Sequence, residues 1–283
     1  MDGVLLVNKP RGIGSSSVVY KLRRLLGTKD IGHCGTLDPL AEGLLVIVIG
    51  KALKISRFLT EDRKEYIATL KLGETTPTLD SESEISERKE VPNFTVEDIE
   101  KVLNSFLGKS YQTPPMYSAI SVNGKKLYEY ARNNQTVEIK SREIEIYDIE
   151  LLEYQNQEIK FRVDCSKGTY IRSLCLDIAK RLNNIGYMTS LIRTKAGDYS
   201  INNSFTLEEI EKNNFSLISV ENALKSTFSI KVADEYELKE IKHGHCINKV
   251  TEGKTLYLDK NRNPLGMYEY DTEKKITKCI RLF

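Results

Sequence analysis

The chain has 283 residues, of which 40% are hydrophobic and 29% charged, so it can bury an ordinary core in one or two domains. Its longest apolar run, residues 44–49, is too short to cross a bilayer, and no basic segment followed by an apolar stretch opens the sequence; we expect a cytoplasmic protein without a membrane span or signal peptide. The five cysteines are widely spaced and include no CxxC pair, which argues against a disulfide framework and a zinc ribbon.

The distribution of charged residues along the chain is more informative about possible partners than the net charge is. A formal net charge of +2 is too small to indicate nucleic-acid binding. Residues 9–29, however, carry six basic side chains and no acidic one. Such clustering can form a surface that faces phosphates. A solvated helix face accounts for the charge pattern at least as well.

Hydrophobic periodicity and turn residues predict the elements of the first part of the chain. A buried strand at residues 3–7 precedes a turn at 8–12 and a helix that the serines at 15–17 can cap and Gly27 can end. The next predicted elements are, in order, a loop at residues 31–43, a central strand at 44–49, a helix at 51–60, a strand at 66–72 and a mobile polar connection at 75–88.

The second part begins with a helix after Thr95 and Asp98, which are spaced as a capping box. The elements predicted after it are strands at residues 143–152 and 159–165 and helices at 171–182 and 206–212. From about residue 227 short strand-like runs dominate, so we predict a first domain at residues 1–226 and an all-β module at residues 227–283. Strands and helices do not alternate strictly, which indicates the α+β class and not a doubly wound sheet.

One loop concentrates the residue types that carry chemistry. Residues 32–45 read GHCGTLDPLAEGLL, with one histidine, one cysteine and two acids before a buried strand. Loops positioned by a rigid strand are frequent sites of catalytic groups. Asp38 precedes Pro39, which favours an extended backbone at Asp38. An ordinary Asp-Pro turn, with glycines for left-handed dihedrals, is the alternative, and composition alone favours that alternative.

As a string, this loop resembles the catalytic motif of the TruB family of pseudouridine synthases, enzymes that isomerise a uridine in the T-arm of tRNA. Further segments resemble other motifs of the family, in one order: KPRG at residues 9–12, KEY at 64–66, QTPPMYSA at 112–119, GKKLYEYAR at 124–132, CSKGTYIR at 165–172 and LIR at 191–193. Thr194 stands where some members carry a second arginine, which weakens the expectation of an RNA contact there.

The resemblance covers about residues 3–207 and is weaker for residues 227–283, which are similar to the PUA-like domain of bacterial members. It implies the pseudouridine synthase fold, with a mixed, mainly antiparallel sheet flanked by helices and a small C-terminal all-β PUA-like domain. It also implies an RNA-gripping insertion at about residues 117–142.

The activity that the resemblance implies is isomerisation of uridine 55 in the T-arm loop to pseudouridine. Because the N1–C1′ bond is exchanged for a C5–C1′ bond within one nucleotide, we expect no cofactor and no metal. An ionised carboxylate is needed as nucleophile, and Asp38 matches it. Arg172 would pair with that carboxylate, since a guanidinium stays charged and can bind in bidentate fashion. Tyr66 corresponds to the tyrosine that stacks on the base and can assist loss of the C5 proton.

The same resemblance places other residues around a flipped uridine. Tyr170 and Leu191 correspond to pocket walls, and His33 to a side chain that holds or replaces the extruded base. Lys9 would contact phosphate or support the loop. Basic side chains elsewhere would bind RNA phosphates, namely Lys21, Arg23, Arg24, Lys125, Lys126 and Lys167. The expected partner is therefore the T-arm stem-loop, bound by a monomer that needs no obligate protein partner.

Two other chemistries fit less well. A Cys–His hydrolase would need Cys34 or Cys165 beside a base, but His33 and Cys34 are adjacent in the chain and cannot form an ordinary nucleophile–base pair. Residues 243–246, which read HGHC, could contribute to a metal site, but a fourth ligand is not nearby, so a turn or an RNA contact is favoured.

The main rival from another class is a non-catalytic RNA-binding protein or tRNA-folding chaperone on the same scaffold. The presence of Asp38, Tyr66 and Arg172 together argues against it. Membership of a guide-RNA complex is a narrower alternative, and the compact C-terminal module with a long insertion favours the stand-alone bacterial type.

Overall fold

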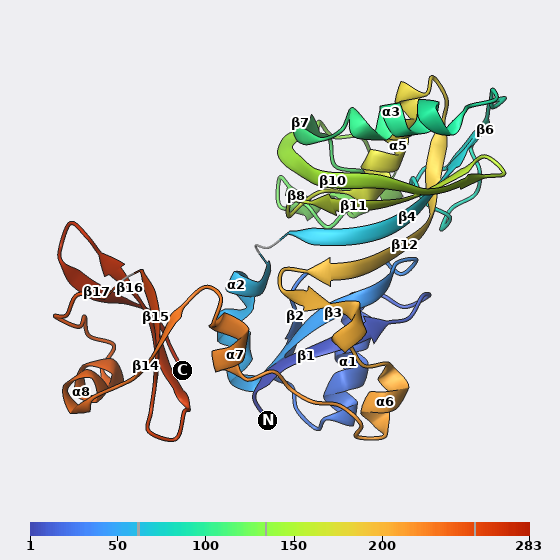
Figure 1. Cartoon of the computed structure of the whole chain (residues 1–283). Helices are drawn as coiled ribbons and strands as arrows, with labels where there is room; N and C mark the ends of the chain where they lie inside the picture. The colour runs from blue at the N-terminus through green and yellow to red at the C-terminus, as the bar shows by residue number, and fades with distance from the viewer. Residues whose placement is uncertain (61–62, 134, 252) are drawn as a thin grey trace.

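Two β-sheets organise the computed structural model, which describes residues 1–60, 63–133, 135–251 and 253–283. Within these residues a nine-stranded sheet forms the body, and a four-stranded sheet lies beside it (Figure 1). Two short hairpins contain β5 Glu74–Thr75 with β6 Glu87–Arg88 and β8 Ser121–Val122 with β9 Lys125–Lys126. No helix in these ranges is long and apolar enough to cross a membrane.

The large sheet consists of two halves joined at a narrow seam. Its strand order is β1-β3-β12-β4-β11-β10-β7, with β2 on β3 and β13 on β12. The strands are β1 Gly3–Lys9, β2 Ile31–His33, β3 Glu42–Ile49, β4 Lys64–Leu72, β7 Gly108–Gln112, β10 Arg142–Gln155, β11 Glu158–Cys165, β12 Gly186–Ala196 and β13 Tyr199–Ser200. Neighbouring strands are antiparallel except at the seam, where β12 runs parallel to β3 through the pairs Ile192↔Glu42 and Arg193↔Gly43. The first half of the sheet contains β1, β2 and β3, and the second half contains the strands from β12 to β7.

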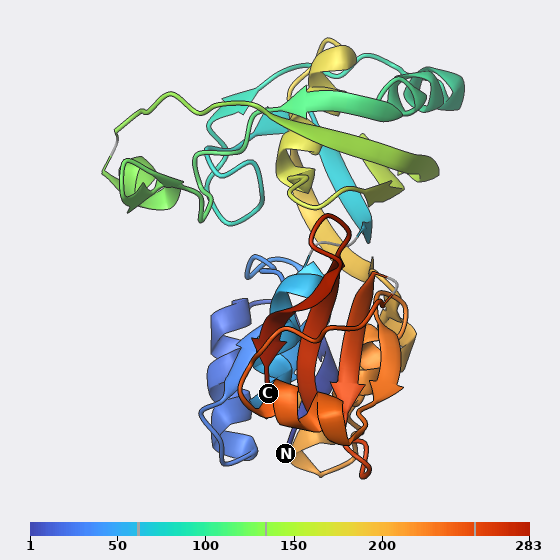
Figure 2. The ribbon, with the colours of Figure 1, turned by 90° about the vertical axis from the view of Figure 1, so that its left-hand side faces the viewer.

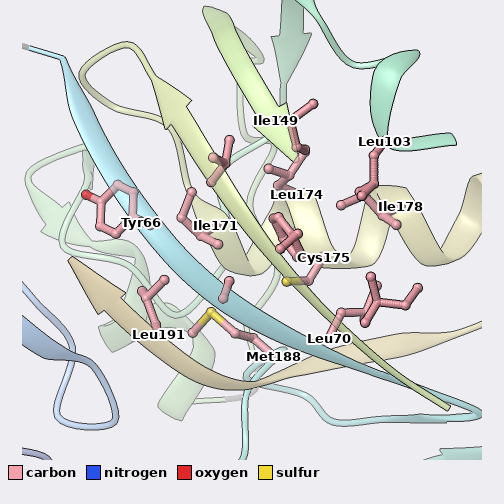
Figure 3. Close-up of a cluster of buried hydrophobic side chains, with 14 of the residues drawn as sticks. Tyr66, Leu70, Leu103, Ile149, Ile171, Leu174, Cys175, Ile178, Met188 and Leu191 are labelled. Carbon is pink, nitrogen blue, oxygen red and sulfur yellow. The ribbon is translucent and has the colours of Figure 1, made fainter. Parts of the chain in front are cut away.

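Helices pack on both halves. The described helices are α1 Ser15–Leu25, η1 Gly50–Ile55, α2 Ser56–Thr60, α3 Val96–Asn104, α4 Leu127–Arg132, α5 Ile171–Arg181, η2 Ile201–Asn203, α6 Leu207–Glu211, α7 Val220–Leu224 and α8 Glu235–Lys242, with η1 and η2 of the 3-10 type. On β4 every second side chain from Lys64 to Leu72 is buried, as a strand with one covered face requires. Those from Tyr66 to Leu72 form one core with α3, α5 and β12, part of which is shown in Figure 3.

The first half of the sheet is buried on both faces because β3 is apolar along residues 44–49. On one face Leu22 of α1 packs in a cluster with Ile47. On the other face Val46 belongs to a cluster that includes Leu256 and Met267 of the four-stranded sheet. The C-terminal sheet therefore shares a core with the first half of the large sheet.

The C-terminal segment is not all-β, so this part of the sequence prediction is wrong. Its strands, in the order β14-β15-β16-β17, are β14 Ser229–Val232, β15 Lys254–Leu258, β16 Pro264–Asp271 and β17 Ile276–Leu282. In chain order α8 follows β14 and precedes β15, and Figure 1 shows it beside the four-stranded sheet. A capping box starts this helix, because Asp234 accepts a hydrogen bond from the Glu237 amide at 2.8 Å while the Glu237 side chain accepts from that of Asp234. Ile241 is buried against the sheet.

The remaining elements follow the predicted pattern in part, and strands β7 and β12 and helix α7 were not predicted. The strand predicted at residues 44–49 and the capping box of Thr95 and Asp98 are confirmed. Helix α1 is capped by Gly14 instead of a serine. The loop predicted from residue 31 begins as strand β2. The connection at residues 75–88 is anchored, since Asp80 within it is buried.

Candidate active site

A pocket of about 320 Å³ opens where the two halves of the large sheet meet. Its walls come from the loop between β2 and β3, from β4 and β12, from the insertion and from the start of α5. Of the residues predicted from the sequence, those that line it are Asp38, Tyr66, Tyr170, Arg172, Leu191 and Lys167, the last predicted as a phosphate contact. Residues far apart in the chain, from both sides of the seam, therefore meet in one concave site.

Asp38 and Arg172 form an ion pair in this pocket. Arg172 Nη2 lies 2.9 Å from Asp38 Oδ2. The arginine side chain is 6% exposed and the aspartate side chain 38% exposed. The guanidinium is thus enclosed, while the carboxylate remains accessible.

Two further segments hold the Arg172 guanidinium. Its Nη1 donates to the carbonyl oxygen of Thr78 at 2.9 Å, and Nη2 donates to that of Tyr117 at 2.8 Å. A second carboxylate, that of Asp80, lies 3.5 Å from Nη1 and is 1% exposed. Asp80 is held in turn by the Thr78 hydroxyl, which donates to it at 2.6 Å. The segment expected to be mobile therefore supplies a buried partner that the sequence did not indicate.

The start of α5 is tied to the strand before the insertion. The side-chain amide of Gln112 accepts a hydrogen bond from the Tyr170 N–H at 2.8 Å and donates to the Tyr170 carbonyl at 3.1 Å. The hydroxyl of Ser173 donates to the Thr113 carbonyl at 3.0 Å. These bonds set the first turn of α5, and with it Arg172, against the base of the insertion.

The loop that carries Asp38 is supported by the N-terminal segment. The Lys9 ammonium group, in a residue with no exposed surface, donates to the carbonyl oxygens of Ile13 at 2.6 Å and Pro39 at 3.5 Å. The Ser15 hydroxyl accepts from the Leu37 N–H at 2.7 Å and donates to the Leu37 carbonyl. Burial lowers the pKa of Lys9. Of the two roles expected for Lys9, phosphate contact or support of the loop, these bonds to backbone carbonyls favour support of the loop.

Tyr66 belongs both to the pocket wall and to the core. It is 8% exposed, and in Figure 3 its hydroxyl oxygen points away from the other labelled side chains. Leu191, on the neighbouring strand β12, is 7% exposed and lies in the same cluster. Burial raises the pKa of the Tyr66 phenol, and the positive charge of Arg193 opposes that effect. At neutral pH the ring therefore presents a neutral phenol.

Arg193 is a pocket residue to which the sequence prediction gave no role in the site. Its side chain is buried, and it lines the pocket. Its Nε–H donates to the carbonyl oxygen of Leu44 at 2.7 Å and its Nη2 to that of Gly35 at 3.2 Å. The sequence did contain a signal. Leu191 and Arg193 are two residues apart on a strand, so a wall residue at one position places the other on the same face.

His33 and most of the predicted phosphate contacts do not line the pocket. His33 lies in β2, and its buried Nδ1 makes no hydrogen bond to any described residue. Burial, and secondarily the charge of Arg193, lowers the pKa of His33. Arg23 donates to the carbonyl oxygen of Ile31 at 2.9 Å. Among the described residues that line the pocket, Lys167 is the one basic side chain that the sequence predicted as a phosphate contact.

The thiols of Cys34 and Cys165 are buried near the pocket, whereas His243 and His245 lie in the C-terminal segment. Burial raises the pKa of both Cys34 and Cys165 to about 12, so each is a thiol at neutral pH and a poor nucleophile. The rings of His243 and His245 stack with their centres 5.5 Å apart. Across the described ranges, no group of three or more His, Cys, Asp or Glu side chains could hold a metal ion.

The arrangement of the strands and helices is shared with other solved structures. Two solved structures show the likeness. A chain in the crystal structure of a Cbf5–Nop10–Gar1 complex matches with a TM-score of 0.73 and 21% identity, over 99% of this chain and 84% of that chain. A chain in the structure of an H/ACA RNP bound to a substrate RNA containing 2′-deoxyuridine matches with a TM-score of 0.71 and 20% identity, over 99% and 84%.

Sequence similarity narrows the class to a family. The family of TruB pseudouridylate synthases (N-terminal domain) matches residues 23–171. The tRNA pseudouridine synthase B of Mesoplasma florum is 41% identical over 99% of this chain and 97% of its own length. That of Oceanobacillus iheyensis is 42% identical over 100% and 98%. The chain belongs to the TruB family of pseudouridylate synthases.

Proposed function

We propose that the chain is a tRNA pseudouridine synthase that isomerises uridine 55 in the T-arm loop. The observation that carries this proposal is the Asp38–Arg172 ion pair, set in a pocket whose walls include Tyr66 and Leu191. Relatives named tRNA pseudouridine synthase B, which match nearly the whole chain, support the same substrate.

The reaction redistributes bonds within one nucleotide. The N1–C1′ bond breaks, the base turns, C5 joins C1′, a proton leaves C5, and N1 gains a proton, so the product is an isomer of the substrate. Asp38 would supply the nucleophile, whether it attacks C1′ or C6. Arg172 contacts one carboxylate oxygen at 2.9 Å, which leaves the other oxygen available for attack. Because the guanidinium is itself fixed by two carbonyls, it would hold the carboxylate in one orientation throughout.

The uridine must leave the RNA loop to reach Asp38, which costs on the order of a few kcal/mol. Stacking on Tyr66 and packing against Tyr170 and Leu191 would offset part of that cost. Tyr66 would then assist loss of the C5 proton as a neutral phenol. His33 lies outside the pocket and would contact the RNA beside the extruded base.

RNA outside the pocket would be bound by two further parts. We assign residues 1–226 to the catalytic domain, with an RNA-gripping insertion at about residues 117–142, and residues 227–283 to a PUA-like RNA-binding domain. The insertion projects from the body (Figure 2) and pairs basic with aromatic side chains, as where Arg132 lies 5.4 Å from the ring centre of Tyr128. The enzyme would act in the cytoplasm as a monomer without an obligate protein partner.

An unmodified tRNA transcript should be converted by the purified protein, and EDTA should leave the rate unchanged once the RNA is folded. The physical reason is that an isomerisation with a carboxylate nucleophile needs neither an electron carrier nor a Lewis acid. Pseudouridine at position 55 is measured by chemical labelling and mass spectrometry, and a transcript with cytidine 55 serves as the control. Tight binding without any conversion would instead identify a non-catalytic RNA-binding protein.

Cys34→Ala and Cys165→Ala should each retain turnover within about tenfold, a barrier change of ~1.4 kcal/mol. Both thiols are buried and have a raised pKa, so we expect them to fill space near the pocket and not to act as nucleophiles. Initial rates at saturating RNA, corrected for the folded fraction, test this. Complete inactivity of a folded, RNA-binding variant would restore a thiol nucleophile as the explanation.

A further inference from the structure

The reacting groups of the proposed enzyme come from opposite sides of the seam in the large sheet. Asp38 lies in the loop between β2 and β3, in the first half, whereas Tyr66 lies on β4 in the second half. Across the described residues β3 and β12 pair at two positions only, Ile192↔Glu42 and Arg193↔Gly43. Because only two residue pairs join the two strands, side chains that bridge the seam should help to fix how the two halves are placed relative to each other.

Arg193 bridges this seam through its backbone and its side chain. Its backbone pairs with Gly43 on β3 and, on the other edge, with Tyr66 on β4. Its guanidinium donates to the carbonyl oxygens of Gly35 at 3.2 Å and Leu44 at 2.7 Å. Gly35 and Leu44 stand just before and just after the segment that contains Asp38, so one planar group fastens both ends of that loop.

The strands pack closely around Arg193. A Cβ atom on Gly43 would lie 2.5 Å from the Arg193 carbonyl oxygen, so the strands approach as closely as they do because residue 43 is glycine. The Arg193 side chain is 1% exposed. A buried guanidinium is costly unless its donors are hydrogen-bonded, and a hydrophobic side chain would fill the space at lower cost. Its presence at the seam therefore calls for a role beyond packing.

We propose that Arg193 is a positioning residue, which fastens the Asp38 loop to β4 so that the carboxylate meets Tyr66 and Arg172 in the reacting geometry. This inference rests on the proposed function. A displacement of about 1 Å in such a constellation can cost roughly 10²-fold in rate without changing the contacts that bind substrate elsewhere. Lysine in place of Arg193 keeps the charge but has one ammonium group and no planar fork for two carbonyls.

Full-length Arg193→Lys and the neutral Arg193→Gln test the proposal. Both are expected to lower the single-turnover rate at saturating RNA by about 10²-fold or more, while the RNA dissociation constant stays within about threefold of wild type. Thermal unfolding gives the folded fraction by which each rate is corrected. The split between rate and binding is the readout that a merely structural arginine would not produce.

Asn184→Ala is the matched control. Asn184 is also buried and polar, and its amide donates to the Glu90 carbonyl at 2.9 Å and accepts from the Gly73 N–H, away from the pocket lining. It should lose stability and keep the wild-type saturating rate. A wild-type rate in folded Arg193→Lys, an equal rate loss in Asn184→Ala, or failure of both Arg193 variants to fold where Asn184→Ala folds would each overturn the positioning role. Absence of pseudouridine from the wild-type protein would overturn the proposed function instead.

Discussion

Purified Asp38→Asn is expected to fold, to bind the T-arm with near-normal affinity and to form no detectable pseudouridine. The amide preserves size and most hydrogen bonds but removes the nucleophilic charge. The loop itself should persist because the Ser15 hydroxyl and the Lys9 ammonium group hold its backbone, not the Asp38 side chain. Arg172 retains the carboxylate of Asp80 as a partner. Stability should therefore change by no more than about 1 kcal/mol.

The measurement is single-turnover conversion at saturating RNA, with a detection limit that would reveal a loss of about 10⁴-fold, or roughly 5 kcal/mol of barrier. Asp164→Asn is the control, since Asp164 also pairs with an arginine, Arg63, but lies outside the pocket that holds Asp38. It should react at the wild-type rate. If Asp38 only shaped a turn, the asparagine variant would be active in proportion to its stability, and pseudouridine above wild-type contamination would refute the nucleophile assignment.

Elements that depend on local patterns could be predicted from the sequence. The run at residues 44–49 is apolar on both faces, and a strand buried on both faces is what forms. Thr95 and Asp98 satisfy each other's backbone donors within a single turn, so no distant contact was needed to predict their capping box. Asp38 was identified because its loop is a long motif with fixed glycines, and the structure places it in a pocket.

Features that depend on distant contacts could not be predicted in this way. Asp80 lies in a polar, acidic segment and reads as a surface residue; it is buried because the Arg172 guanidinium reaches it from a helix that begins about ninety residues later. Helix α8 is mostly charged, and its apolar side packs on strands that follow it. The shared core of Val46 and Leu256 likewise joins segments whose proximity no local pattern records.

Arg172→Lys is expected to lower the saturating rate by about 10²-fold or more while RNA affinity stays within about threefold of wild type. Lysine keeps the positive charge, so the test isolates geometry from charge. In the structure Nη2 contacts Asp38 and the Tyr117 carbonyl, while Nη1 contacts the Thr78 carbonyl. A single ammonium group cannot reach both the contacts of Nη2 and the contact of Nη1. The carboxylate would lose its fixed orientation, and one buried carbonyl would lose its donor, at a cost of about 1–3 kcal/mol in stability.

Single-turnover rates and binding isotherms on the same RNA separate these effects, with Arg162→Lys as the matched control. Arg162 also contacts more than one carboxylate, with those of Asp148 at 2.7 Å and Glu150 at 2.8 Å the nearest, but it does not line the pocket. Its lysine variant loses the same planar fork and should keep the wild-type rate. A wild-type saturating rate in Arg172→Lys would show that any cation suffices beside Asp38. A loss confined to RNA affinity would show that Arg172 binds the nucleic acid and does not orient the nucleophile.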